Sequence, residues 1–223
     1  MLIRKVSVFL NATFHTQTVL SKHRMTEKES KYYERIKSEL IGQKICEVYY
    51  EEVNWETDES EFWEFSTDIH SVDMNVIFRL ENGKLIQIFW DNEFYSYDVG
   101  FTIIDKLEKK KEGFKTFNVS ENKNWKKLIG EKISGIRVLW DISEGITTEY
   151  ENDRIVKSEN TVIKLPQTWE FSFGKNKIWI ATLEIKEDES DNYYWADHLT
   201  IIFSNEVQEK YKLSENTGSQ YYI

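Results

Sequence analysis

The sequence predicts an α+β protein, predominantly antiparallel β-sheet, built from two tandem helix–strand–hairpin–strand units that arose by internal duplication. Most apolar residues fall in short runs rich in Val, Ile, Phe and Trp, which is typical of strands. The segment Leu40–Ile45 (LIGQKI) returns as Leu128–Ile133 (LIGEKI), 88 positions later. We expect one unit in residues 1–112, which also hold the N-terminal strands, and one in 113–223. The two units would pack as one or two sheets, or form one compact domain overall.

Two strands, over 2–10 and 14–20, are expected before the first unit, which itself begins with a helix over 26–41. Thr26-Glu27-Lys28-Glu29 is a capping-box pattern, in which the Thr hydroxyl and the Glu29 carboxylate each accept an amide at the helix start. Tyr33, Ile36 and Leu40 then share one helical face. Gly42 follows at the position where a left-handed residue ends a helix.

Strands dominate the rest of the first unit. We expect one over 45–50, a loop or strand pair within the acidic stretch 51–73, and another strand over about 94–104. Between them lies the clearest hairpin, with strands 76–81 and 84–89 around Asn82-Gly83. Asn-Gly permits positive φ at both central positions, which predicts a type I′ turn.

The second unit repeats this order. A charged connector (106–112) leads to a helix that begins at Ser120 as N-cap and ends at Gly130. A strand over 132–140, a long hairpin tip over 141–160 and a strand over 169–173 come next. The return strand begins at Ile178, another strand covers 193–203, and 207–213 is a final strand or a short helix.

Two further matches extend the repeat. Leu80–Leu85 corresponds to Phe173–Ile178 at an offset of 93, and Phe101–Ile104 corresponds to Leu199–Ile202 at 98. The growing offset is what loop insertions in a duplicated unit would produce.

Composition and charge narrow the functional classes. The chain has one cysteine, one proline and no long apolar run, and its start lacks a signal-peptide cleavage site. These features favour a cytoplasmic protein and give no sign of a membrane segment. The net charge is −10, and residues 41–105 alone contribute −12. Nucleic acid is therefore not an expected partner, because phosphate binding needs clustered Lys and Arg.

No catalytic or cofactor motif stands out. The four histidines, His15, His23, His70 and His198, show no metal-ligand spacing, and the phosphate-loop, dinucleotide and nucleophile-elbow patterns are absent. Carboxylate pairs such as Asp91 and Glu93 are interpreted as solvated faces. Cys46 is expected to be a small buried hydrophobe. We therefore assign no catalytic residue, no metal and no cofactor.

The aromatic residues give the main functional hypothesis. The chain has 8 Trp, 12 Tyr and 13 Phe, and several lie among acidic residues. Such a surface suits a non-enzymatic binding protein that captures a basic protein, because aromatics anchor a partner while charge steers it. One form would be an immunity- or antitoxin-like inhibitor. The candidate binding residues are Glu51, Glu52, Trp55, Asp58, Glu59, Trp63, Tyr150 and Trp195.

Two alternatives remain open on the sequence. Aromatics in a β cavity would suit a small-ligand or carbohydrate binder, which predicts a deep apolar pocket. Converging carboxylates would suit a hydrolase, with or without a divalent metal. The sequence does not indicate an oligomeric state.

Overall fold

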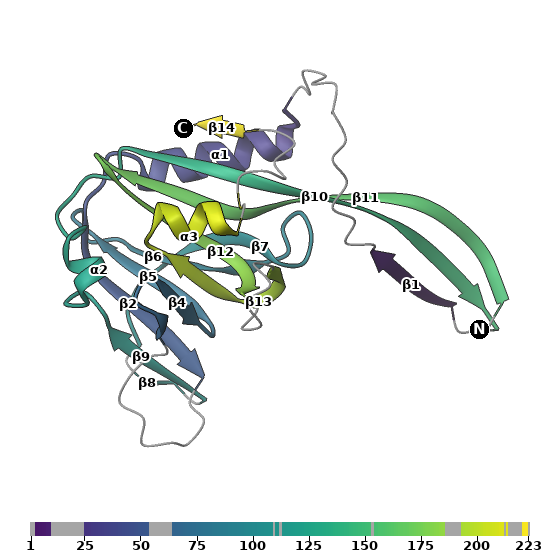
Figure 1. The fold of residues 1–223 in the computed structure, drawn as a ribbon, viewed down its shortest axis with the longest axis horizontal. Coiled ribbons are helices and arrows are strands. Elements are labelled where there is room, and N and C mark those ends of the chain that lie inside the picture. The colour runs from purple at the N-terminus through teal and green to yellow at the C-terminus, as the bar shows by residue number, and fades with distance from the viewer. Residues whose placement is uncertain are drawn as a thin grey trace.

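The protein folds into two antiparallel β-sheets that share one buried core, as the computed structural model shows (Figure 1). The structure describes residues 3–9, 25–53, 64–108, 110–111, 113–152, 154–185, 193–211, 213 and 220–222. Within these residues it is mostly strand, with three helices. This confirms the β-rich class that the short runs of Val, Ile, Phe and Trp predicted.

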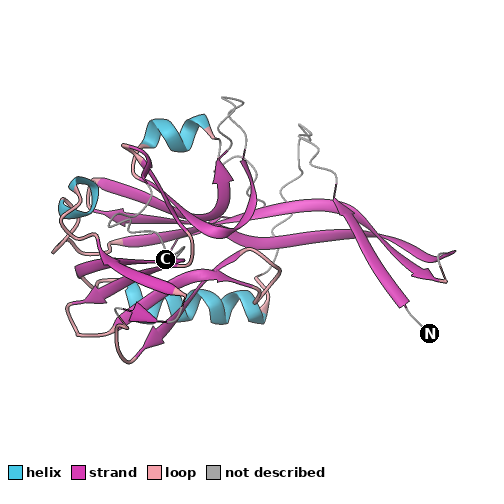
Figure 2. Cartoon of the chain, turned by 90° about the horizontal axis from the view of Figure 1, so that it is seen from below, coloured by secondary structure: helices cyan, strands magenta, loops and turns pink. Residues whose placement is uncertain are grey.

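The larger sheet has eight strands in the order β1-β10-β11-β12-β13-β4-β3, with β14 also paired to β10. Their bounds are β1 (Ile3–Phe9), β3 (Glu64–Ser66), β4 (Ile69–Val72), β10 (Gly135–Glu151), β11 (Arg154–Phe173), β12 (Asn176–Ile185), β13 (Tyr193–Ile202) and β14 (Gln220–Tyr222). Strands β10 and β11 are far longer than the rest and run out beyond the body of the molecule (Figure 2).

The smaller sheet has six strands in the order β7-β6-β5-β2-β9-β8. Their bounds are β2 (Ile45–Val53), β5 (Asn75–Leu80), β6 (Leu85–Asp91), β7 (Asp98–Ile104), β8 (Lys110–Lys111) and β9 (Phe114–Asn118). Its inner face carries Val76, Phe78 and Leu80, while Ile77 packs on the outer face. This is the alternation expected of a strand that has one face on the core.

Helix α1 (Glu27–Leu40) begins with the predicted capping box. The Glu29 amide donates to the Thr26 hydroxyl (3.2 Å), and the Thr26 amide donates to the Glu29 carboxylate (2.7 Å). Gly42 ends the helix region with φ +82°. The buried face carries Tyr32, Tyr33, Ile36 and Leu40, so α1 contributes aromatic residues to the core between the sheets.

The other two helices are short. Helix α2 (Lys123–Lys126) is capped by Asn122 rather than by Ser120, so the sequence-based N-cap was wrong. The Ser120 hydroxyl instead accepts the Val48 amide (2.9 Å). Helix α3 (Asn205–Lys210) takes up part of the segment 207–213. Together with Tyr211 and Leu213 it covers a second apolar cluster on the outer face of the larger sheet, around Trp179 and Leu183.

The two LIGxKI segments meet in the structure. The Gly42 amide donates to the Ile133 carbonyl and the Gly130 amide donates to the Ile45 carbonyl, both at 2.8 Å. Lys44 and Lys132 form an antiparallel bridge between them. Both glycines have φ +82°.

Two further sequence expectations need correction. The β5–β6 hairpin lies where predicted, but only Gly83 has positive φ. The Leu80 amide bonds the Lys84 carbonyl (2.9 Å), so the loop is a three-residue turn closed by a left-handed glycine and not a type I′ turn. Cys46 is exposed, because the β2–β5 register is interrupted between Ile45 and Glu47, so that Ile45 and Val48 face the core and Cys46 does not. The strand predicted over 14–20 lies outside the described residues.

Candidate functional site

Three acidic residues lie near one another in the backbone where β2 ends and β4 passes into β5, with Glu51 and Glu52 on opposite faces of β2. We call Glu51, Glu52 and Asp73 the acidic strand end. The Asp73 amide donates to the Glu52 carboxylate (2.7 Å), and the Val53 amide donates to the Asp73 carboxylate (3.2 Å). The side-chain amide of Asn75 donates to the Glu51 carboxylate. In the described part of the chain, the donors to these three carboxylates are therefore all uncharged.

Glu52 differs from its two neighbours in burial. It is only 8% exposed, and its Oε1 atom has no hydrogen-bond partner among the described residues. Burial raises the pKa of Glu52 to about 8; the nearby Asp73 charge also raises it, and the Asp73 amide opposes the shift. Glu52 is thus mainly a neutral acid at pH 7, and the charge of the acidic strand end comes from Glu51 and Asp73.

A buried hydrogen-bond network holds this end of β2 in place. The Trp125 indole N–H donates to the Tyr50 hydroxyl (2.6 Å), which is also bonded to His70 Nδ1 (2.8 Å). Burial, together with the charge of Lys123, lowers the pKa of His70 to about 4. The His70 ring is therefore neutral at pH 7 and packs edge-on to Phe203, with ring centroids 4.7 Å apart. The network ties β2 to β4 and α2, which makes the strand end a rigid platform.

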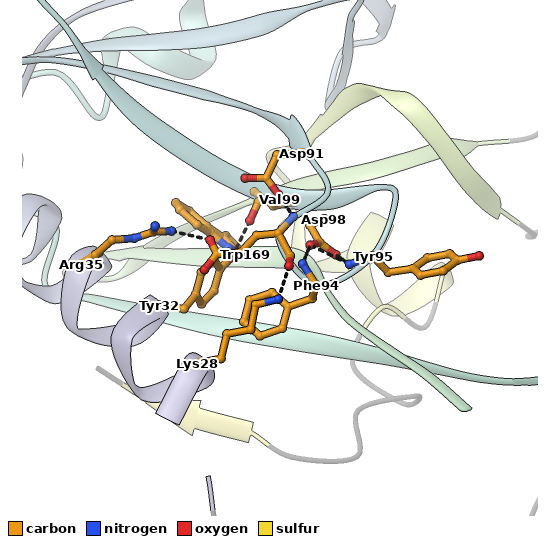
Figure 3. A network of polar contacts seen from close by, with 10 residues as sticks. Lys28, Tyr32, Arg35, Asp91, Phe94, Tyr95, Asp98, Val99 and Trp169 are labelled. Atoms are coloured by element: carbon orange, nitrogen blue, oxygen red, sulfur yellow. Dashed lines mark hydrogen bonds and ion pairs between the residues drawn. The ribbon is translucent and has the colours of Figure 1, made fainter. Parts of the chain in front are cut away.

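A second group of carboxylates closes the loop between β6 and β7 (Figure 3). Asp91 and Asp98 face each other across this strand pair. Asp98 is fully buried and accepts the amides of Phe94 and Tyr95. Burial raises its pKa to about 7, and those two amides oppose the shift. Burial also raises the pKa of Asp91.

Helix α1 reaches this loop from the other side. Arg35 forms an ion pair with Glu93 (2.6 Å), and Lys28 donates to the Glu93 carbonyl and lies 4.5 Å from the centre of the Phe94 ring. Gly100 lies tightly against Asp91: a Cβ at that position would be 2.0 Å from a carboxylate oxygen, so the Asp91 side chain would have to move. This arrangement fixes a loop whose Tyr97 has φ +72°. It does not suit carboxylate catalysis, because Asp98 is inaccessible and its oxygens are bound to the loop.

An open hollow of about 650 Å³ lies beside α2 and the start of β2. It is lined by Cys46, Glu47, Asn118, Ser120, Glu121, Lys126 and Ile129. Since this lining contains no aromatic side chain, the hollow lacks the stacking platform expected for a sugar. Most of its lining residues are polar, whereas a small-ligand site is usually lined mainly by apolar and aromatic side chains.

The structure brings together only part of the predicted site. Glu51 and Glu52 lie at the acidic strand end, whereas Trp55, Asp58, Glu59 and Trp63 lie outside the described residues, as do His15 and His23. Tyr150 and Trp195 belong to the other sheet. Tyr150 is opposite Ile155 in the long hairpin. The half-buried Trp195 donates its indole N–H to the Asp141 carboxylate (2.7 Å).

Sequence reasoning missed Asp73 and Asn75 as neighbours of Glu51. Asp73 is the last residue of the acidic stretch and Asn75 is the first residue of β5. Only the β2–β5 register places Asn75 opposite Glu51. The only feature of the sequence that pointed to Asp73 was the acidic composition of residues 51–73.

No protein-family model matches this chain, and neither does any curated protein or solved structure. Among the residues that the structure describes, no group of three or more His, Cys, Asp or Glu side chains is arranged to hold a metal ion. None of the helices seen in this part of the chain is long and apolar enough to cross a membrane.

Proposed function

We propose that this chain is a non-catalytic protein that binds a basic protein partner, with the acidic strand end as part of the binding surface. The observation that carries the proposal is the pairing of Glu51 and Asp73 with uncharged donors only, within the described residues. Their negative charge is left to act on solvent and on a partner. A carboxylate held by neutral donors attracts a lysine or arginine more strongly than one already in an ion pair.

The surrounding charge supports this choice of partner. The acidic block 41–105 has three basic residues, Lys44, Arg79 and Lys84, and two of them are already in ion pairs. Arg79 pairs with Glu47, and Lys84 pairs with Glu39 (2.5 Å). An uncompensated field of this kind speeds the approach of a positively charged protein.

A rigid platform also supports binding over catalysis. The Tyr50–His70–Trp125 network fixes the strand that carries Glu51, and a pre-ordered surface loses less entropy when a partner binds. In the finer form of the proposal the protein is a cytoplasmic inhibitor of immunity or antitoxin type, with neither nucleic acid nor a membrane as its partner.

We also propose that the two sheets derive from one duplicated unit. Strands β2-β5-β6-β7 and β10-β11-β12-β13 are each four consecutive neighbours in their sheets. Phe78 and Phe171, which correspond at the offset of 93, contact each other across the core with ring centroids 5.8 Å apart. The reciprocal Gly42–Ile133 and Gly130–Ile45 hydrogen bonds are what a pseudo-twofold axis between two copies would give.

The test begins with the partner. The full chain is immobilised and exposed at low salt to an extract of the cells that naturally express it, and the retained protein is identified and purified. Its dissociation constant is then measured for the wild type and for the double variant Glu51→Gln/Asp73→Asn. The double variant should bind about tenfold more weakly.

A matched variant removes the same amount of charge elsewhere. Glu81→Gln/Glu121→Gln changes two exposed residues, in the β5–β6 turn and beside α2, and should bind within about twofold of the wild type. Retention of no basic protein, or equal weakening in both double variants, would contradict the proposal.

A further inference from the structure

The long hairpin of β10 and β11 forms an arm that leaves the body of the protein (Figures 1 and 2). We define the arm as residues 142–164 of this hairpin together with β1, which pairs with β10 over 145–151. Strand β10 is therefore the middle strand of the arm. Strand β12 pairs with β11 only from Thr168 onward.

Within the described part of the chain, one edge of β11 in the arm is not paired with another strand. Among the described residues, positions 154–165 of β11 pair with β10 on one side and with no strand on the other. Every described side chain from Arg154 to Asn160 is exposed. A regular edge strand of this length presents a row of backbone N–H and C=O groups that another strand can pair with.

The arm also exposes apolar side chains. Ile142, Ile146 and Val162 are 38%, 46% and 65% exposed, and Ile155 and Val156 are 63% and 53% exposed. Ile142 and Ile146 lie on the same face of β10, because they are four positions apart. Val162 of β11 is paired with position 144, midway between them, so it lies on that face too. A ribbon of three strands with an exposed apolar face gains stability when the sheet is extended.

The charges on the open edge are self-complementary. Lys157 and Glu159 lie two positions apart on the same face of β11 and form an exposed ion pair of 2.7 Å. If two β11 edges pair antiparallel about a twofold axis at Ser158, Lys157 lies opposite the partner's Glu159, and Glu159 lies opposite the partner's Lys157. Opposite charges that face each other across antiparallel strands stabilise the pairing. A second copy of this chain, which offers both a Lys and a Glu, is thus a better partner for this edge than a segment that carries only basic residues.

We propose that the open edge of β11 pairs with the same edge of a second copy of this chain, which joins the two arms into one continuous sheet. The twofold axis passes through Ser158, so the interface is isologous. This surface is separate from the acidic strand end, and the dimer does not depend on the proposed function.

The test is the oligomeric state of the full chain by sedimentation equilibrium, from about 1 μM to about 1 mM. The wild type should show a monomer–dimer equilibrium within this range. Each single reversal, Lys157→Glu or Glu159→Lys, puts two like-charged pairs across the twofold axis. Each should therefore raise the dissociation constant by about tenfold or more.

Charge pairing makes the decisive part of the test. An equimolar mixture of the two single variants should form a heterodimer, because both cross-strand pairs are then of opposite sign. The double reversal Lys157→Glu/Glu159→Lys should restore the homodimer. Lys175→Glu, in the exposed β11–β12 turn, should leave the dissociation constant unchanged, and thermal melting checks that every variant is folded.

Two results would overturn the proposal. If the wild type stays monomeric over the whole concentration range, the proposed dimer does not form. Lys157 and Glu159 would then serve to prevent the edge from pairing with another strand. A dimer that is indifferent to the single reversals would place the interface elsewhere on the molecule.

Discussion

Three buried tyrosine hydroxyls each accept a hydrogen bond from a tryptophan indole in the core. Trp169 donates to Tyr32 (2.7 Å), Trp140 donates to Tyr33 (2.6 Å) and Trp125 donates to Tyr50 (2.6 Å). A buried aromatic residue with a polar atom needs such a partner. These pairs span at least 75 positions of the chain, so their residue types could be expected in the core from the sequence while their pairing could not.

Buried charge is satisfied in the same way on the larger sheet. Glu170 is 1% exposed and is bonded by Arg137, Lys177 (2.8 Å) and the Trp179 indole (3.1 Å). Burial opposes its ionisation, but the bonds and charges of Lys177 and Arg137 outweigh that cost and lower the pKa of Glu170. This carboxylate contributes stability that is present above the ordinary carboxyl pKa and is lost as pH falls.

Glu52 should behave in the opposite way. Because its pKa of about 8 in the folded state lies above the ordinary 4.5, the folded state holds the proton more tightly than the unfolded state. The free energy of unfolding should therefore fall as pH rises toward 8 and level off above it. The variant Glu52→Gln cannot ionise at this position. Relative to that variant, the free energy of unfolding of the wild type should fall by roughly 3 kcal/mol between pH about 5 and about 8.

Urea unfolding at a series of pH values measures this difference. Glu51→Gln controls for the loss of one negative charge at the same strand end. A wild type that runs parallel to Glu52→Gln over the whole pH range would show that Glu52 is already ionised in the folded protein.

Among the elements, α1 is the one that the sequence predicted best. Its capping box, buried face and terminal glycine are local patterns, so residues within one or two turns decide them. Turns and strand edges were less predictable. The β5–β6 turn type depends on which residue takes positive φ, and the cap of α2 depends on the contact of Ser120 with Val48, 72 positions away.

The capping box of α1 can be tested by a matched pair of substitutions. Thr26→Ala removes the hydroxyl that accepts the Glu29 amide and should lower the free energy of unfolding by about 1 kcal/mol. Ser30→Ala, one turn into the same helix, should change it by less than about 0.5 kcal/mol. Chemical denaturation measures both. Equal effects would mean that the cap adds nothing beyond helix propensity.

For the whole molecule, the sequence predicted a mostly antiparallel protein but not how its sheets are arranged. Either one or two sheets agreed with the strand pattern, and only long-range pairing settles the choice. In the structure, α1 bonds to Trp140 and Trp169 of the larger sheet, whereas α2 bonds to Tyr50 of the smaller one. Each helix thus holds the sheet formed largely by the other half of the chain.

If the chain arose by duplication, substituting equivalent residues in the two units should lower the free energy of unfolding by equal amounts. Gly42 and Gly130 have the same φ of +82° and no atom within 4 Å of an added Cβ, so substitution acts through the backbone alone. Gly42→Ala and Gly130→Ala should each lower the free energy of unfolding by about 1–2 kcal/mol, by amounts that agree within error.

Asparagine tolerates the left-handed conformation better than alanine. Gly42→Asn and Gly130→Asn should therefore both cost less than the alanine variants, as thermal or urea unfolding can show. A large loss of stability on substitution of one glycine, with no loss at the other, would argue against the equivalence of the two LIGxKI segments.

The candidate site was predictable only in outline. The acidic block and the choice of Glu51 follow from composition, because uncompensated charge is visible in the sequence. The burial and raised pKa of Glu52 follow from strand packing, which composition does not reveal. Tyr150 and Trp195 were grouped with Glu51 by residue type, yet sheet topology places them on the larger sheet.

The most direct test of the account is the association rate constant of the chain with its purified partner as a function of ionic strength. If negative charge at the acidic strand end steers a basic protein, the rate constant should fall about tenfold or more between about 0.01 M and about 0.15 M salt. The fall should be shallower for Glu51→Gln/Asp73→Asn. A rate constant indifferent to salt, or an unchanged slope in that variant, would contradict the account.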